Sequence, residues 1–334
     1  MQDNASRLKK RLKSIGLSDS AIVAAWPTWW SDAAEASASA QTELRFSLAR
    51  KLGLDPHSLL KDNEEPRFIW RDEARFKHLR DESPIERSAI TSFGTALGRY
   101  LIEATAGGPS TVGWDALRLR GAILATQPYI RLVALLSVCW GFGIPVVHLR
   151  IFPCTRKRMS AMTVRIGDRI AILVGKDSMY PPHIAFYLAH ELAHIALGHL
   201  SEEPILVDLE DGNVRGANDD PEEIDADRFA LELLTGTSQP TVLPRFERYS
   251  SKELARIALD SAPDLAIEPG TLALCFGFST RDWATANAAM QSIYESPKPV
   301  WSEINRLALN QLNFSMIPDD ARSYLHTILG DPQS

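Results

Sequence analysis

The chain has 334 residues, of which 45% are hydrophobic and 23% charged, and its formal net charge is -6. These values are typical of a folded protein with two or three domains, and they exclude a chain that coats nucleic acid through overall positive charge. Its three cysteines are widely spaced, which excludes a disulfide framework and a CxxC zinc site. The N-terminus lacks an apolar signal segment and the longest apolar run, 132–147, is broken by glycine and proline, so we expect a soluble, cytoplasmic protein.

Residues 1–60 are predicted to form a small helical domain. Apolar residues recur at helical spacing before Gly16, between Ser18 and Pro27, and before Gly53, and these four residues are typical of helix ends. The stretch LRFSLARKLGLDPHSLL resembles the closing helices of XRE-type helix-turn-helix domains, which implies that this domain contacts DNA.

A basic cluster in the first predicted helix could contact DNA phosphates; it consists of Lys9, Lys10, Arg11 and Lys13. The alternative is a solvated helix face. Residues 1–65 contain nine basic and nine acidic side chains, so the domain as a whole is not basic. A helical module that docks a target regulator fits these residues as well as a DNA-binding domain does.

The charge-dense residues 61–84 are predicted to form a connector with some helix, and helical spacing resumes at Ile85. Helices are expected around 114–126 and 128–140. The apolar, β-branched segment 143–152 predicts a strand, and 162–175 predicts a hairpin that turns at Gly167-Asp168. A polar loop is expected over 201–221, and residues 241–334 are predicted to form a helical C-terminal region.

The sequence HELAH at 190–194 predicts a metal site. His190 and His194 are four residues apart, which places both imidazoles on one face of a helix, within reach of one ion. Glu191 can accept a proton from water beside that ion. The surrounding helix is apolar on most sides, so these polar side chains need partners. The alternative is a pair of hydrogen-bonded core histidines.

The third ligand defines the class of metal site. An extended HExxHxxGxxH motif is excluded, because Leu197 and Leu200 stand where glycine and histidine are required. His199 is nine residues from His190, about half a turn out of phase, so we expect it to point away from the ion and to cap the helix end near Gly198. The acids Asp208, Glu210 and Asp211 fall in the expected loop.

The predicted helix EEIDADRFALELL, 222–234, supplies better candidates. Glu223 and Asp227 are one turn apart, so Glu223 can bind the metal while Asp227 accepts a hydrogen bond from the far nitrogen of a ligand histidine. Glu222 and Asp225 are alternatives that lack an equivalent partner on a core-facing helix. Two histidines, one glutamate and water make an open, catalytic zinc site.

HELAHIALGH followed by EIDADRFALELL resembles the ImmA/IrrE family of metallopeptidases, which have HExxH on one helix and an E-x-x-A-[ND]-x-F-A segment on the next. The resemblance covers roughly 85–240. It implies that His190, His194 and Glu223 bind Zn²⁺ and that Glu191 is the catalytic base, with Asp227 where the family has Asn or Asp. It also implies cleavage of a partner regulator or repressor in a stress or mobile-element response.

The expected fold is α+β and mostly helical, with a zincin-like metallopeptidase core around a small three-stranded sheet and helical regions on both sides. The expected activity is that of a zinc-dependent, site-specific endopeptidase. The alternative is a DNA-binding or antitoxin-like regulator that senses or docks without cutting; the presence of Glu191 favours the enzyme. Candidate donors to the oxyanion of the reacting carbonyl are Tyr180, His183, Tyr187 and Tyr249.

Overall fold

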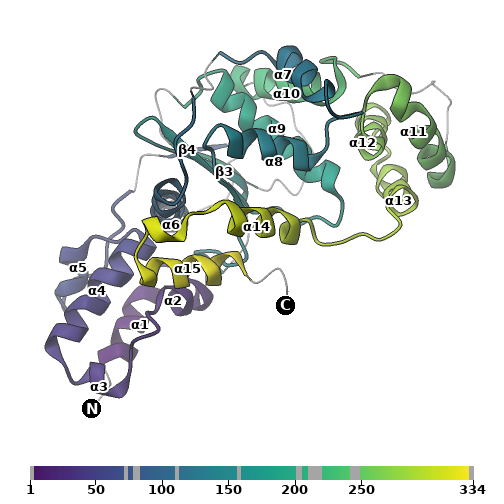
Figure 1. Ribbon diagram of the computed structural model, residues 1–334. Helices are drawn as coiled ribbons and strands as arrows, with labels where there is room; N and C mark the ends of the chain where they lie inside the picture. The colour runs from purple at the N-terminus through teal and green to yellow at the C-terminus, as the bar shows by residue number, and fades with distance from the viewer. Residues whose placement is uncertain are drawn as a thin grey trace.

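A five-stranded mixed sheet lies at the centre of an otherwise helical chain (Figure 1). The computed structural model describes residues 4–70, 74–77, 83–109, 113–155, 159–200, 205–209, 220–240 and 249–330. The sheet order is β1-β5-β3-β4-β2, and its strands are β1 (Ala74–Lys77), β2 (Val146–His148), β3 (Met159–Ile166), β4 (Arg169–Val174) and β5 (Ile205–Leu209). β3 is antiparallel to both of its neighbours, whereas β1 pairs with β5, and β2 with β4, in parallel.

The prediction of an α+β, mostly helical fold is confirmed, but the prediction of three strands was wrong. The expected strands are present as β2, β3 and β4, with the hairpin turn at Gly167-Asp168. β1 lies in the connector where some helix was expected, and β5 lies inside the expected polar loop. The two strands pair with each other across a long stretch of chain, so no local turn sequence predicts them. The rest of 201–219, including Glu210 and Asp211, lies outside the described residues.

Three of the five N-terminal helices end within two residues of Gly16, Pro27 or Gly53, as the sequence indicated, whereas the short helix at Asp32–Glu35 was not predicted. The five helices are α1 (Asn4–Ser14), α2 (Asp19–Ala25), α3 (Asp32–Glu35), α4 (Ala38–Leu52) and α5 (Pro56–Leu60). Ser18 caps α2 by accepting a hydrogen bond from the amide of Ala21, and Asp55 caps α5 in the same way through the amide of His57. The apolar faces of α1, α2 and α4 join one hydrophobic cluster with α6 (Pro84–Glu103) and the sheet.

The two faces of the sheet belong to two different cores. On β3, Met162 and Val164 pack in the cluster that contains α6 and the N-terminal helices, whereas Thr163 between them contacts α9 (Pro181–Ala196). β4 and β5 alternate in the same way, because successive side chains of a strand point to opposite faces. The α9 face is covered by α7 (Ala116–Leu124), α8 (Leu132–Gly141) and α10 (Pro221–Thr235).

The C-terminal region forms two separate groups of helices (Figure 1). The first group, α11 (Ser251–Leu265), α12 (Pro269–Thr280) and α13 (Trp283–Ile293), packs mainly on itself and meets the rest of the chain where α12 contacts α9. α12 falls within the region 241–334 that was predicted to be helical, although its residues are apolar on nearly all sides and give no stripe. The second group is α14 (Val300–Gln311), a short 3-10 helix (Phe314–Met316) and α15 (Asp319–Leu329).

The second group returns to the body of the protein. α14 packs beside β2, and α15 contacts α2 and α4. Lys51 of α4, which is nearly inaccessible, donates to Asp320 at 2.5 Å and to the carbonyl of Ala25 at 3.1 Å, while Tyr324 donates to the carbonyl of Lys51. The last helix of the chain is therefore tied to the N-terminal helices by buried polar contacts.

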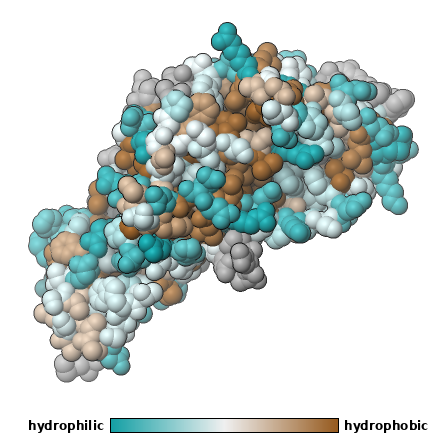
Figure 2. Space-filling view, in the orientation of Figure 1, coloured by the Kyte–Doolittle hydropathy of each residue, from teal (hydrophilic) through white to brown (hydrophobic). Residues whose placement is uncertain are grey.

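The surface is mixed in character. Figure 2 shows apolar residues gathered over the middle of the molecule, in the region of α8 and α9, with hydrophilic residues around them. α8 is apolar on almost every side, and Val133 on it is 44% exposed. No helix among the described residues is long and apolar enough to cross a membrane.

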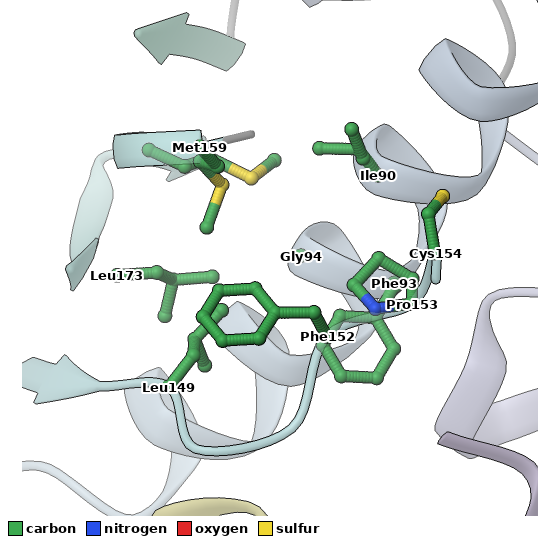
Figure 3. Close-up of a pocket in the computed structure, with 10 residues that line it drawn as sticks. Ile90, Phe93, Gly94, Leu149, Phe152, Pro153, Cys154, Met159 and Leu173 are labelled. Atoms are coloured by element: carbon green, nitrogen blue, oxygen red, sulfur yellow. The ribbon is translucent and has the colours of Figure 1, made fainter. Parts of the chain in front are cut away.

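A small apolar pocket lies on the α6 side of the sheet, between α6, the β3–β4 hairpin and the loop after β2 (Figure 3). A Cβ atom on Gly94 would lie 2.3 Å from the sulfur of Met162, so the absence of a side chain there lets α6 approach β3 closely. The pocket opens on the face opposite to α9.

Asn305 of α14 supplies a test of how the C-terminal helices are held. This fully buried amide accepts from the amide of His148 at 2.7 Å and donates to the carbonyls of His148 and Leu329 at 2.7 and 2.6 Å. Asn305→Ala should lower the free energy of unfolding by about 3 kcal/mol, because three buried backbone groups lose their partner. Urea denaturation should show no comparable loss for Asn310→Ala, an exposed position on the same helix. Equal stability of the two variants would contradict this role.

Candidate metal centre

Two buried helices bring the predicted ligands together. α9 begins at a Pro-Pro pair and carries His190, Glu191 and His194 on the side that meets the sheet and α10. α10 begins after Asp220, which accepts a hydrogen bond from the amide of Glu222, and Glu223 lies in its first turn. Apolar side chains of α10 pack against α9; they are Ala226, Phe229, Ala230, Leu233 and Leu234. This packing fixes Glu223 opposite the two histidines.

The donor atoms of His190, His194 and Glu223 converge on one point. The two Nε2 atoms are 3.0 Å apart, Glu223 Oε2 is 3.3 Å from Nε2 of His190, and its Oε1 is 3.4 Å from Nε2 of His194. Four-coordinate zinc with bonds of about 2.0–2.1 Å separates its ligand atoms by about 3.3 Å. Among the described residues this is the one group of three His, Cys, Asp or Glu side chains with suitable spacing. The donor set and spacing therefore fit a zinc ion.

Asp227 lies where the sequence predicted it. Its Oδ1 is 3.0 Å from Nδ1 of His190, the ring nitrogen that faces away from the cluster. A carboxylate at this position orients the imidazole and makes Nε2 a stronger ligand. Glu222 and Asp225, the alternatives on the same helix, are not part of the cluster; Asp225 forms an ion pair with Arg228 instead.

The electrostatics of the cluster also suit a cation. Burial lowers the pKa of His190, but the hydrogen bonds and charges of Asp227 and Glu223 outweigh burial and raise it to about 10. Burial raises the pKa of Glu223, but His190 and His194 outweigh burial and hold it well below its usual range. A proton on His190 therefore offsets part of the negative charge of Glu223 and Asp227 in the metal-free protein. A metal ion must displace that proton, so we expect metal affinity to fall as the pH falls.

Glu191, the predicted catalytic base, is buried beside the ligands. Its Oε2 accepts a short hydrogen bond from the hydroxyl of Thr163 in β3. Thr163 was not singled out in the sequence, although its hydroxyl is the one polar side chain in the apolar run from Ala161 to Val164. Since α9 is held against β3 partly by this bond, the carboxylate of Glu191 is fixed relative to the cluster.

His199 stands outside the ligand set, as predicted, but its ring contacts the ligand His194. Its Nδ1 lies 2.7 Å from Nδ1 of His194, and the ring centroids are 5.0 Å apart. The helical spacing did not predict this contact, because α9 ends at Ala196 and the phase of an ideal helix no longer applies at residue 199. The expected cap was correct: the amide of His199 donates to the carbonyl of His194.

The four candidate oxyanion donors have different surroundings. Tyr180 and His183 contact each other at the start of α9, where Tyr180 also packs on Tyr294. Burial lowers the pKa of His183, which hydrogen-bonds Ser178. Tyr249 packs on Phe276 in the α11–α13 group. Tyr187 precedes His190 by three residues and so shares the ligand side of α9.

The basic cluster of α1 is largely engaged within the N-terminal region. The guanidinium of Arg11 donates to the carbonyls of Ser58, Lys61 and Glu64 near the end of α5, and its side chain is 13% exposed. The ammonium of Lys9 lies 4.5 Å from the ring centroid of Trp26, and Lys13 forms an ion pair with Asp19. Lys10 is exposed. DNA contact by this cluster stays a prediction. Arg11 already joins α1 to the end of α5 through its hydrogen bonds.

Comparisons of the chain with models of known protein families, with curated proteins and with solved structures find no match. The assignment of a role to the cluster therefore rests on its own geometry and chemistry.

Glu223→Gln should remove most of the bound zinc, because an amide is a weaker ligand than a carboxylate and leaves the buried cation less compensated. Metal content after purification and the zinc dissociation constant from chelator competition measure the loss. Glu222→Gln is the matched control, since it makes the same change one residue earlier on α10. Unchanged zinc binding by Glu223→Gln would show that Glu223 is not the third ligand.

Asp227→Ala should weaken zinc binding by about 10–100-fold without removing a ligand, because His190 loses the group that orients it. The same chelator competition measures this change. Asp225→Ala removes an acid from the solvent side of α10 and should bind zinc like the wild type. Equal affinity of the two variants would exclude the orienting role of Asp227.

Proposed function

We propose that this chain is a zinc-dependent endopeptidase that cleaves a specific partner protein. The observation that supports this most directly is the presence of Glu191, which is buried, follows the ligand His190 in the sequence and is held by Thr163, together with a three-residue ligand set. A site that uses zinc only for structure closes its coordination with a fourth protein ligand and needs no acid–base group beside it. Three ligands with a neighbouring carboxylate are the arrangement of a hydrolytic site.

His190, His194 and Glu223 would hold the zinc ion, with Asp227 orienting His190. A zinc ion in such an open site polarises a peptide carbonyl and makes water a nucleophile near neutral pH. The hard carboxylate and the two imidazoles suit zinc better than a soft copper(I) ion, and the donor set has too few oxygens for calcium.

Glu191 would act as the general base and then as the general acid. Its carboxylate accepts a proton from the water that attacks the carbonyl carbon, and later delivers that proton to the nitrogen of the departing amine. Thr163 holds one oxygen of Glu191 through its hydroxyl, and this bond orients the carboxylate for the exchange of the proton. Burial of the pair keeps the carboxylate in one orientation during both transfers.

The substrate that we propose is a regulatory, repressor-like protein, and the class of enzyme that we propose is an ImmA/IrrE-like metallopeptidase with a zincin-like core. Two features support this. The HELAH helix and the EIDADRFALELL helix pack so that their motif residues meet, as the resemblance implies. The chain also carries N-terminal and C-terminal helices outside α9 and α10 that offer surface for recognising one partner. We place this activity in a stress or mobile-element response.

Glu191→Gln should abolish cleavage, with a rate loss of about 10²–10⁴-fold, because the amide cannot take up a proton. Comparison of new protein N-termini in cells that express wild type or Glu191→Gln measures this. One dominant cleavage found only with wild type would identify the substrate and the bond.

Two controls accompany that comparison. Purified Glu191→Gln should bind zinc like the wild type, which shows that the loss is chemical, and Glu222→Gln should still cleave. Identical N-termini for wild type and Glu191→Gln, under stress as well as at rest, would contradict the peptidase and favour a regulator that binds without cutting.

A further inference from the structure

A second histidine contact lies behind the candidate metal site. His199 stands outside the ligand set, three residues beyond the last residue of α9, yet its Nδ1 approaches Nδ1 of His194 to 2.7 Å. The Nε2 atom of His194 faces the cluster, 3.0 Å from Nε2 of His190. The two nitrogens of His194 therefore have separate partners, one toward the candidate metal and one toward His199.

The backbone explains why His199 reaches His194. α9 ends with Leu197 as its C-cap, and Gly198 follows with φ of +78°, the left-handed conformation that glycine adopts most easily. The amide of Gly198 donates to the carbonyl of Ile195 and the amide of His199 to the carbonyl of His194. This pair of bonds is a Schellman motif, which folds the residue after the glycine back over the last helical turn. An apolar contact usually completes such a motif, and here two imidazoles take its place.

The protonation pattern then follows from the chemistry of imidazole. A histidine that binds a metal through Nε2 carries its hydrogen on Nδ1, so Nδ1 of His194 is a donor. Nδ1 of His199 must accept, which places the hydrogen of His199 on its Nε2. The contact fixes the tautomer of His194 and the direction of its ring, as Asp227 does for His190.

We propose that His199 is a positioning residue for the metal site: it accepts a hydrogen bond from Nδ1 of His194 and holds Nε2 of His194 in the ligand position. This inference rests on the metal centre of the proposed function, but not on peptide cleavage. It assigns different outer partners to the two ligand histidines, a carboxylate for His190 and a neutral imidazole for His194.

Two substitutions separate hydrogen bonding from packing. His199→Phe keeps an aromatic ring but removes the acceptor, whereas His199→Asn removes the ring but puts a carbonyl oxygen close to the place of Nδ1. We expect His199→Phe to bind zinc about 10–100-fold more weakly than wild type in chelator competition, and His199→Asn to keep most of the affinity. The visible absorption of the Co²⁺-loaded proteins should match between wild type and His199→Asn and differ for His199→Phe.

The control is His57→Phe, which makes the same change at an exposed histidine of α5. Thermal unfolding of the metal-free proteins should give similar Tm values for all variants, which separates a metal effect from a folding effect. Wild-type affinity in His199→Phe, or equal weakening in both His199 variants, would overturn the proposal. If zinc binding depends on His199 but the protein cleaves no partner, the role of His199 is supported and the peptidase assignment fails.

Discussion

Burial of four ionisable side chains between the sheet and α10 is the constraint around which this half of the molecule is built. His190, Glu191, His194 and Glu223 are each less than a tenth exposed. Unpaired charges in such surroundings cost several kcal/mol each, so the fold must supply a partner for every one. Thr163 of β3 binds Glu191, Asp227 of α10 binds His190, and His199 binds His194. Glu223 faces both ligand histidines. A shift of β3, α10 or the end of α9 would break one of these bonds, so the three elements hold a common position.

The sheet separates two apolar cores, and the candidate site is set into the one on the α9 side. On the α6 side, the core continues without interruption from the strands into the N-terminal helices and α15. Buried polar contacts of Lys51, Asp320 and Tyr324 there join the two ends of the chain. Burial of apolar area stabilises both sides of the sheet, and on the α9 side it must also offset the cost of burying the candidate site. The pocket beside Gly94 belongs to the α6 side, where it is lined by carbon and sulfur atoms.

The sequence predicted those features that depend on near neighbours. His190, His194, Glu223 and Asp227 could be placed because each pair lies one turn apart on a helix whose ends are marked by proline, aspartate or glycine. β1 and β5 could not, because their pairing is parallel and distant and their residues show no long alternation. α12 lies in the region predicted to be helical, but its uniform apolarity gave no stripe to mark where the helix begins and ends. The contact of His199 with His194 was not predicted, because the spacing of an ideal helix does not apply past Gly198, where the backbone reverses. The role of Arg11 depends on carbonyls about fifty residues away.

The position of the cluster along its two helices strengthens its preference for a cation. His194 lies in the last turn of α9 and Glu223 in the first turn of α10. The C-terminal end of a helix carries partial negative charge and the N-terminal end partial positive charge. The end of α9 therefore favours a cation beside His194, while the start of α10 favours the ionised form of Glu223 that binds it. Both helix ends therefore stabilise the metal-bound state. Gly198 contributes at the α9 end, because it terminates the helix there. The residues that end a helix are thus part of the chemistry of this site, since the turn that closes α9 also brings His199 to His194.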